Sequence, residues 1–328
     1  MKTSALCFTG VDRVELAETN IPDPGPSELV VAAAYSAISP GTELRCLSGR
    51  QHGGAFPFIP GYSLVGHVAA RGRDVKLTEG TPVFCRGTER ASHSLLWGAH
   101  MAHALCDASR VFPVPPGVDL LEASLAKLSA IAYRGVRVAD TRPHEEVAVV
   151  GLGAIGQLAA RLHAIAGARV VAGDLEPTRV QLARAAGLEA LVPADGLASA
   201  FARYQPKGAD VVVDATGAPA VLAQSIQLAK AKPWDDAATT PTRLVIQGSY
   251  VENVAFSYRE AFARELIVHF PRDNQAGDIA VALRLLAEGR LKARDLISTV
   301  AEPARAPEIY AALRAARPGL ITAVFKWP

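Results

Sequence analysis

The spacing of apolar residues changes about a third of the way along the chain. Up to about residue 118, short alternating runs such as 28–35 are separated by proline and glycine, which is typical of a β-rich domain with tight turns. Beyond about residue 120, alanine- and leucine-rich segments with helical spacing alternate with short apolar runs. These runs lie at 146–150, 169–173, 210–214 and 243–247. Such alternation predicts an α/β domain with a doubly wound parallel sheet.

The first of these apolar runs leads directly into a glycine-rich turn. Gly151, Gly153 and Gly156 have the Gly-x-Gly-x-x-Gly spacing, and a segment with helical spacing follows them. A strand, this turn and a helix in succession bind a dinucleotide pyrophosphate, because the N–H groups at the helix start face the anion. We therefore predict a pyrophosphate site that consists of Gly151, Gly153, Ala154, Ile155 and Gly156.

Asp174 ends the second apolar run and is the residue expected to select the cofactor. It lies eighteen residues after Gly156, where a carboxylate that binds a ribose hydroxyl is expected. Such a carboxylate accepts hydrogen bonds from the 2′-hydroxyl of NAD(H) and repels the 2′-phosphate of NADP(H), so NAD(H) is favoured. Arg179 is expected on the adenine side. Further cofactor contacts are expected at the strand ends, from Thr216, Gly217, Gly248 and Ser249.

Composition narrows the partners to small molecules. Half of the 328 residues are hydrophobic, which is enough for the cores of two domains. The 34 basic and 32 acidic residues give a net charge of +2 without long blocks of one sign, so we expect neither a nucleic-acid nor a membrane partner. No signal peptide or long apolar span is recognised, and the four cysteines are widely spaced. These features predict a cytoplasmic protein.

Further motifs resemble those of the medium-chain dehydrogenase/reductase superfamily over the whole chain. They include Ser-Pro-Gly-Thr-Glu at 39–43, Pro-Gly-Tyr-Ser at 60–63 and Asp-Ala-Thr-Gly at 214–217. Within the superfamily, the chain is most similar to the branch that contains bacteriochlorophyllide a dehydrogenase.

The resemblance implies a particular domain organisation. A GroES-like, β-rich catalytic domain would consist of residues 1–122 and 269–328, and a Rossmann dinucleotide-binding domain, residues 123–268, would be inserted between them. The resemblance also implies an active site between the two domains and a homodimer assembled through the Rossmann domain.

The resemblance locates the positions where zinc-containing members of the superfamily hold their metal. In this chain those positions are Ser39 or Pro40, then Tyr62 and Ser63, and then Lys127. They do not provide the thiolate and imidazole ligands that zinc requires, so we expect no zinc.

A second possible metal cluster lies between residues 85 and 106. It consists of Cys85, His93, His100, His103 and Cys106. A strand over residues 97–106 would place His103 on the opposite face from His100 and Cys106, so we expect no metal there either.

Without zinc, a side chain must exchange the proton of the reacting alcohol or ketone. We predict that Tyr62 does so, because a nearby Lys127 ammonium would favour the phenolate form of a group with a reference pKa near 10. Thr42 matches the proton-relay hydroxyl of the superfamily, and Ser39 is an adjacent hydroxyl. The alternative is a structural role for each: a buried ring, a solvated lysine and two turn hydroxyls. We expect Glu43 to be a structural carboxylate.

These residues predict a zinc-independent, NAD(H)-dependent oxidoreductase that acts on a secondary alcohol or ketone. We expect its substrate pocket to be lined by His52, Trp97, His100 and His269. Two other functions remain open. One is NAD(P)H-dependent reduction of an activated C=C or C=N bond, and the other is dinucleotide binding without catalysis.

Overall fold

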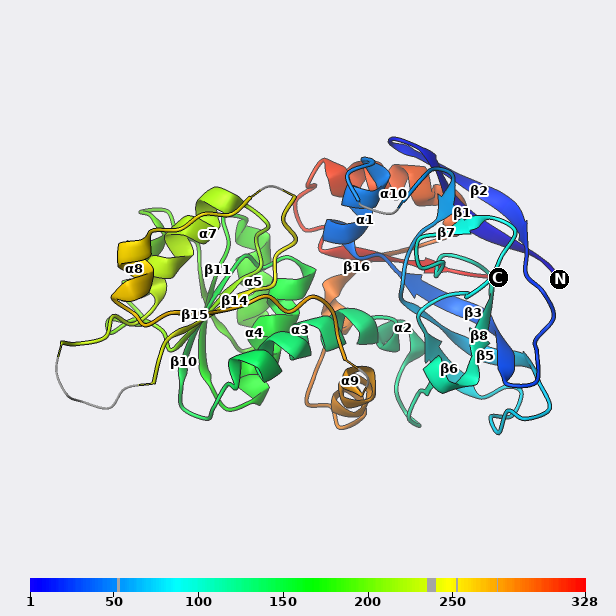
Figure 1. Cartoon of the computed structure of the whole chain (residues 1–328), viewed down its shortest axis with the longest axis horizontal. Helices are drawn as coiled ribbons and strands as arrows, with labels where there is room; N and C mark the ends of the chain where they lie inside the picture. The colour runs from blue at the N-terminus through cyan, green and yellow to red at the C-terminus, as the bar shows by residue number, and fades with distance from the viewer. Residues whose placement is uncertain (52–53, 235–239, 252, 276) are drawn as a thin grey trace. The chain divides into compact units, whose positions relative to one another are not determined.

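A computed structural model describes residues 1–51, 54–234, 240–251, 253–275 and 277–328. Within these residues the chain forms two compact units (Figure 1). Unit 1 consists of Met1–Lys127, Ile279–Gly289 and Ala293–Pro328, and unit 2 consists of Leu128–Asp278 and Arg290–Lys292. The expected junctions lay after residues 122 and 268. The second of these would divide a strand of the unit 2 sheet at 267–269, and the junction in the structure lies beyond that strand.

Unit 1 is built on two β-sheets. The first contains, in spatial order, β2 (Arg13–Asn20), β1 (Lys2–Gly10), β4 (Phe58–Ile59) and β7 (Ser94–Leu95). The second contains β16 (Ile297–Ala301), β17 (Thr322–Lys326), β3 (Glu28–Ala37), β5 (Leu64–Arg71), β6 (Pro82–Cys85) and β9 (Phe112–Pro113), with β8 (His103–Asp107) paired to β3. The helices associated with this unit are α1 (Pro40–Leu47), α2 (Leu120–Ala123), α9 (Asp278–Ala287) and α10 (Ala306–Arg314).

The core of unit 1 joins the two ends of the chain. Phe8 of β1 makes edge-to-face contacts with Phe58 of β4 and with Tyr310 of α10, at centroid distances of 5.6 and 5.2 Å. Phe325 of β17 is fully buried in the same core. Residues after 279 therefore complete a hydrophobic core that the first hundred residues begin.

Unit 2 contains one parallel sheet with helices on both of its faces (Figure 1). Its strands in spatial order are β12 (Glu189–Leu191), β11 (Arg169–Gly173), β10 (Glu146–Val150), β13 (Val211–Asp214), β14 (Arg243–Ile246) and β15 (Ile267–His269). Its helices are α3 (Ala126–Ala139), which begins at the end of unit 1, α4 (Ala154–Ile165), α5 (Pro177–Ala185), α6 (Leu197–Ala202), α7 (Pro219–Ser225) and α8 (Tyr258–Phe262). This architecture confirms the predicted fold class. The three-residue edge strands β12 and β15 were not predicted, because such short runs carry little periodicity.

The prediction of a strand over residues 97–106 is wrong for the first half of that segment. Trp97 and Gly98 have φ angles of 76° and 70°, which turn the backbone out of an extended conformation. The regular strand β8 begins only at His103. His100 therefore lies in an irregular segment, and a two-residue alternation does not determine where its side chain points.

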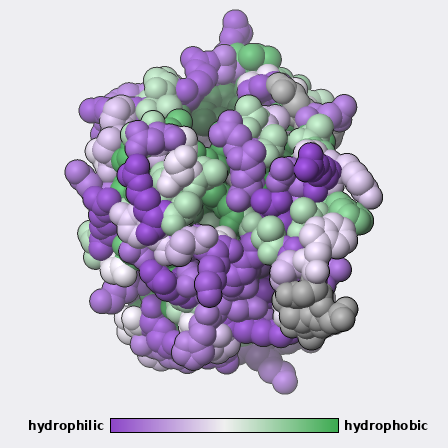
Figure 2. Space-filling model, turned by 90° about the vertical axis from the view of Figure 1, so that its left-hand side faces the viewer, coloured by the Kyte–Doolittle hydropathy of each residue, from purple (hydrophilic) through white to green (hydrophobic). Residues whose placement is uncertain are grey.

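Unit 2 exposes several aromatic side chains around α8. Trp234, Tyr258 and Phe262 are exposed, and the ring of Phe262 lies 5.9 Å from that of Trp234 and 5.6 Å from that of Tyr258. Figure 2, which looks onto the left-hand side of Figure 1, shows apolar and polar surface interleaved. The expected homodimer stays a prediction. In the part of the chain that the structure describes, no helix is long and apolar enough to cross a bilayer.

We predict that His163 makes the protein less stable in acid. This residue of α4 is fully buried, and burial together with Arg243 lowers the pKa of its imidazole from 6.5 to about 3. The unfolded chain binds a proton near pH 6.5, whereas the folded protein binds none until about pH 3. The stability that the neutral His163 imidazole contributes is therefore complete above pH 6.5. Between pH 6.5 and about pH 3 the free energy of unfolding falls with decreasing pH, by up to about 1.4 kcal/mol per pH unit.

Urea unfolding between pH 7 and pH 4 measures this effect. His163→Gln keeps an acceptor for Thr141, whose hydroxyl lies 2.9 Å from the imidazole Nδ1 atom. The free energy of unfolding of this variant should fall less steeply with acid than that of the wild type. Equal slopes would contradict the prediction.

Candidate active site

The glycine turn of unit 2 has the close backbone contacts that a strand, turn and helix need. Gly151 has a φ of 89°, a conformation that favours glycine, and its N–H donates to the Gly173 carbonyl at 2.8 Å. A Cβ atom on Gly156 would lie 1.7 Å from the Gly151 oxygen. Only glycine therefore permits α4 to approach β10 this closely.

Gly153 differs from Gly151 and Gly156 because the direction in which a side chain would project from it is open space. A Cβ atom built there would meet no atom within 4 Å. Gly153 is the N-cap of α4, and Ala154 and Ile155 follow in the first turn. The first N–H groups of a helix have no partner within the helix. The open side and these N–H groups suit a pyrophosphate.

Asp174 follows β11 and holds the glycine turn in place. Its carboxylate accepts the Leu152 N–H at 2.6 Å and the Glu176 N–H at 2.9 Å. The Arg179 guanidinium lies 3.4 Å from the same carboxylate. The two charged residues predicted for the cofactor are thus paired with each other, next to the turn.

The residues predicted at the ends of β13 and β14 are brought together. A Cβ atom on Gly248 would lie 2.5 Å from the Gly217 nitrogen, and one on Gly217 would lie 2.9 Å from the Ser249 oxygen. One on Gly151 would lie 2.9 Å from the Thr216 side chain. Backbone from three loops therefore meets at the carboxyl edge of the sheet, where parallel α/β folds bind ligands.

Asp214 and Tyr250 complete this edge and were not predicted as site residues. The fully buried Asp214 carboxylate accepts hydrogen bonds from the Thr216 N–H and hydroxyl, the Ser225 hydroxyl and the Tyr250 hydroxyl. Burial and this carboxylate raise the pKa of Tyr250, so its phenol stays protonated as a donor. Nothing local in the sequence indicates Tyr250, because its role depends on a residue 36 positions earlier.

In unit 1, the three predicted hydroxyl groups meet. Tyr62 lies between β4 and β5 and is only 7% exposed. Its hydroxyl donates to Ser39 Oγ at 2.5 Å and also lies 3.3 Å from Thr42 Oγ1. Ser39 is the N-cap of α1 and Thr42 belongs to its first turn. The start of one short helix therefore holds the Tyr62 phenol.

Lys127 is buried beside Tyr62. Its side chain is 1% exposed, and its ammonium lies 5.6 Å from the centroid of the Tyr62 ring. The edge of Trp97 packs on the same ring at a centroid distance of 5.1 Å. Burial rules out a solvated lysine. The ammonium lies over the ring face and interacts with its π-electrons.

Two of the histidines expected in the substrate pocket, His100 and His269, have different surroundings. Both ring nitrogens of the fully buried His100 are occupied, by the Ser36 hydroxyl at 2.7 Å and the Glu43 carboxylate at 2.9 Å. We therefore assign His100 to the core. His269 is the last residue of β15 in unit 2, and burial lowers the pKa of its imidazole below 6.5. His52 lies outside the described residues.

The possible metal cluster between residues 85 and 106 is divided among separate contacts. His93 Nδ1 bonds to the Thr19 hydroxyl, and His103 Nδ1 bonds to the Thr3 hydroxyl. Cys106 donates to the Gly87 carbonyl. Among the described residues, no three His, Cys, Asp or Glu side chains are grouped closely enough to hold a metal ion.

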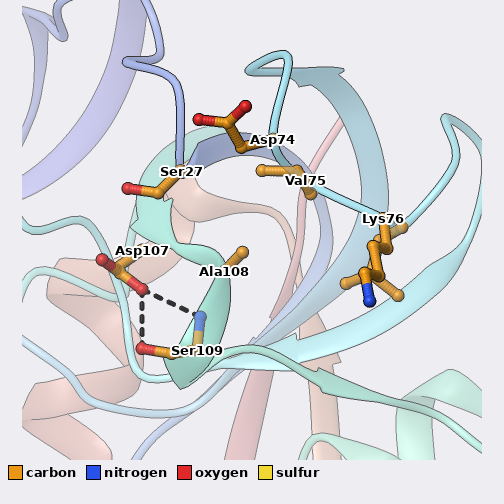
Figure 3. Close-up of a pocket in the computed structure, with 8 residues that line it drawn as sticks. Ser27, Asp74, Val75, Lys76, Asp107, Ala108 and Ser109 are labelled. Carbon is orange, nitrogen blue, oxygen red and sulfur yellow. Dashed lines mark hydrogen bonds between the residues drawn. The ribbon is translucent and has the colours of Figure 1, made fainter.

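A hollow of about 340 Å³ in unit 1 does not include the predicted residues (Figure 3). Asp107 accepts hydrogen bonds from the Ser109 N–H at 2.8 Å and the Ser109 hydroxyl at 2.6 Å, and so caps a turn at Ala108–Arg110. Asp74 and Lys76 lie across from it. Asp107 serves the local backbone, and we assign no chemistry to the hollow.

A β-rich unit and a parallel-sheet unit that carries a glycine turn are the two parts expected of a medium-chain dehydrogenase/reductase. Residues 25–116 match the alcohol dehydrogenase GroES-like domain, and residues 154–232 match the zinc-binding dehydrogenase family. The 2-desacetyl-2-hydroxyethyl bacteriochlorophyllide A dehydrogenase of Rhodobacter capsulatus is 29% identical over 317 residues, which cover 94% of both chains. The chain belongs to the alcohol dehydrogenase-like class of the medium-chain dehydrogenase/reductase superfamily.

Solved structures agree with this fold over the full length. An oxidoreductase/dehydrogenase of unknown specificity from Escherichia coli matches 100% of both chains with a TM-score of 0.88 and 18% identity. A dehydrogenase from Sinorhizobium meliloti, solved with NADP bound, matches 99% of both chains with a TM-score of 0.85 and 23% identity. At these identities the two structures support the fold alone.

We predict that Gly153 and Gly156 respond differently to substitution. Gly153→Val places a side chain in the open space of the turn, so the thermal midpoint should stay close to that of the wild type while binding of NADH and NADPH weakens at least about tenfold. Gly156→Ala meets backbone at 1.7 Å and should lower the midpoint clearly. Thermal unfolding and fluorescence titration measure both effects. Wild-type cofactor affinity in Gly153→Val would remove the pyrophosphate from this turn.

Proposed function

We propose that the protein is a zinc-independent, NAD(H)-dependent oxidoreductase that transfers hydride between nicotinamide and a secondary alcohol or ketone. The observation that carries the proposal is the buried Tyr62 hydroxyl, which is held by Ser39 and Thr42 beside Lys127. This group supplies a proton without a metal. The cofactor is assigned to unit 2 and proton transfer to unit 1.

The residues at the superfamily's metal positions do not fit a zinc ion. Ser39 and Tyr62 use their hydroxyls for each other, and the Ser63 hydroxyl donates to the Ser124 carbonyl at 2.5 Å. The remaining position holds the ammonium of Lys127, which repels a divalent cation. Zinc sites in proteins use thiolate, imidazole and carboxylate ligands. We therefore derive no step through a metal.

Proton transfer follows from the contacts of Tyr62. When bound, nicotinamide gives hydride to a carbonyl carbon or accepts it from an alcohol carbon. In reduction, Tyr62 donates its proton to the oxygen that becomes the hydroxyl, and the Ser39 hydroxyl then turns to donate to the Tyr62 oxygen. In a buried site the Lys127 ammonium stabilises the negative charge left on Tyr62. Oxidation of the alcohol reverses these steps.

The charges beside the glycine turn support a preference for NAD(H). In this proposal the Asp174 carboxylate, next to the glycine turn, accepts a hydrogen bond from a ribose 2′-hydroxyl and repels a 2′-phosphate. Its pairing with Arg179 weakens this repulsion without reversing its sign. The preference should therefore be moderate and should depend on the charge of Asp174.

We predict that wild-type protein binds NADH more tightly than NADPH and that Asp174→Asn reduces this ratio. The amide keeps the size of the side chain and an acceptor oxygen but removes the charge, so NADH should bind about 1 kcal/mol more weakly, or about fivefold. Fluorescence titration with both cofactors gives the ratio. Equal or tighter binding of NADPH by the wild type would overturn the assignment.

For Tyr62→Phe we predict a fall in kcat of about 100-fold or more, the scale of general acid–base catalysis. The ring, and with it the Trp97 and Lys127 contacts, is retained, so NADH affinity and thermal stability should change little. The assay follows NADH oxidation over a panel of simple and polyhydroxylated ketones after treatment with a chelator.

The matched control is Tyr35→Phe, which removes the hydroxyl of a partly exposed tyrosine on β3 of the same unit. This variant should keep wild-type kcat. Retention of more than about a third of turnover by Tyr62→Phe would assign the proton to another group. Activity that is lost with the chelator and restored by zinc would overturn the metal-independent mechanism.

A further inference from the structure

Glu43 is a fully buried carboxylate that three hydrogen-bond donors surround. Its Oε1 atom accepts the Ser39 N–H at 2.7 Å. Its Oε2 atom accepts His100 Nε2 at 2.9 Å and the Tyr310 hydroxyl at 2.5 Å. Burial and this carboxylate raise the pKa of Tyr310 well above its usual value, so the phenol stays protonated as a donor. The three donors come from α1, from the segment before β8, and from α10.

The network continues from His100 to the last strand of unit 1. The Ser36 hydroxyl lies 2.7 Å from His100 Nδ1, and the Trp327 indole N–H donates to Ser36 Oγ at 2.9 Å. Ser36 and His100 have no exposed surface, and Trp327 is 3% exposed. The cluster is therefore closed to solvent, and its protons must be distributed among its own atoms.

Only one distribution of protons gives each group a partner. Trp327 can only donate, so Ser36 accepts from it and directs its own proton to His100 Nδ1. His100 then carries its proton on Nε2 and donates it to Glu43. A second proton on Nδ1 would leave the Ser36 hydroxyl without an acceptor. The network thus consists of a neutral imidazole and an ionised carboxylate that accepts from three donors.

This network reaches Tyr62 through Ser39 and reaches the preceding residue, Gly61, through His100. An N-cap serine normally uses its hydroxyl to bond its own helix, but Ser39 makes no such cap, and its Oγ accepts from Tyr62 instead. Glu43 fixes Ser39 through the backbone N–H. A Cβ atom on Gly61 would lie 2.6 Å from the His100 ring, so the imidazole packs directly against the residue before Tyr62.

We propose that Glu43 is a positioning residue for Tyr62, and that Tyr310, His100, Ser36 and Trp327 hold its carboxylate in place. The proposal rests on the function of Tyr62 given above. Buried ionic groups add little net stability relative to apolar side chains of equal volume. The contribution of this network is the orientation of Ser39 and of the turn that carries Tyr62.

The test uses the full-length protein and two readouts. Glu43→Gln removes the charge and one acceptor at nearly constant volume. Its kcat with the panel ketone that is reduced fastest should fall about tenfold or more, because misplacement of a catalytic group lowers turnover, whereas KM and NADH affinity should stay within about twofold. The second readout is the ¹³C NMR signal of the Tyr62 Cζ atom, assigned by its loss in Tyr62→Phe, which should move in Glu43→Gln.

Three further variants make the test specific. Tyr310→Phe removes one donor and keeps the ring, and Trp327→Phe removes the indole donor and keeps an aromatic side chain of smaller size. Each should move the Tyr62 signal and lower kcat about threefold. If Glu43→Gln does not fold, these two variants test the proposal in its place. Thr19→Val is the matched control, because it removes a buried hydroxyl of unit 1 that bonds to Ser92 and His93, outside the network. It should leave both readouts unchanged.

The outcomes separate this proposal from the proposed function. An unmoved Tyr62 signal in the network variants overturns the positioning role, whatever the activity. Wild-type kcat in Glu43→Gln, together with an inactive Tyr62→Phe, also overturns it. A moved signal with full turnover in Tyr62→Phe supports positioning and instead refutes the catalytic role of Tyr62.

Discussion

A carboxylate buried without solvent must have its hydrogen bonds provided by the protein, and in unit 1 this requirement falls on Glu43. Its donors come from α1, from the irregular segment before β8 and from α10, so these elements have to meet at one point. At the same point Ser39 accepts the Tyr62 hydroxyl, and His100 packs against Gly61, the residue before Tyr62. The arrangement of the proposed proton-transfer site is thus tied to satisfying one buried carboxylate.

Unit 2 depends on a different constraint, the close approach of backbone to backbone. Gly156 permits α4 to touch the turn after β10, and Gly217 and Gly248 permit the loops after β13 and β14 to touch each other. Side chains at these points would separate the loops at the carboxyl edge of the sheet, where parallel α/β folds bind ligands. Asp174 and Asp214 then fix the loops through their N–H groups.

The two units therefore contribute different chemistry by different means. Unit 2 offers backbone N–H groups and small residues, which suit a phosphate-rich cofactor and impose few demands on side chains. Unit 1 offers a phenol, two hydroxyls and an ammonium in a buried cluster, which suit proton transfer and the stabilisation of a developing negative charge.

The sequence alone determined the features that depend on neighbouring residues. The glycine turn and the strands β10 and β11 follow from local periodicity and spacing, because a strand, turn and helix are formed by adjacent residues. Resemblance to a superfamily added Tyr62 and Lys127. Only the tertiary structure placed His100 in the core and joined Glu43 to Tyr310, 267 positions later. A hydrogen bond between such distant residues leaves no local pattern, since it exists only after the chain has folded.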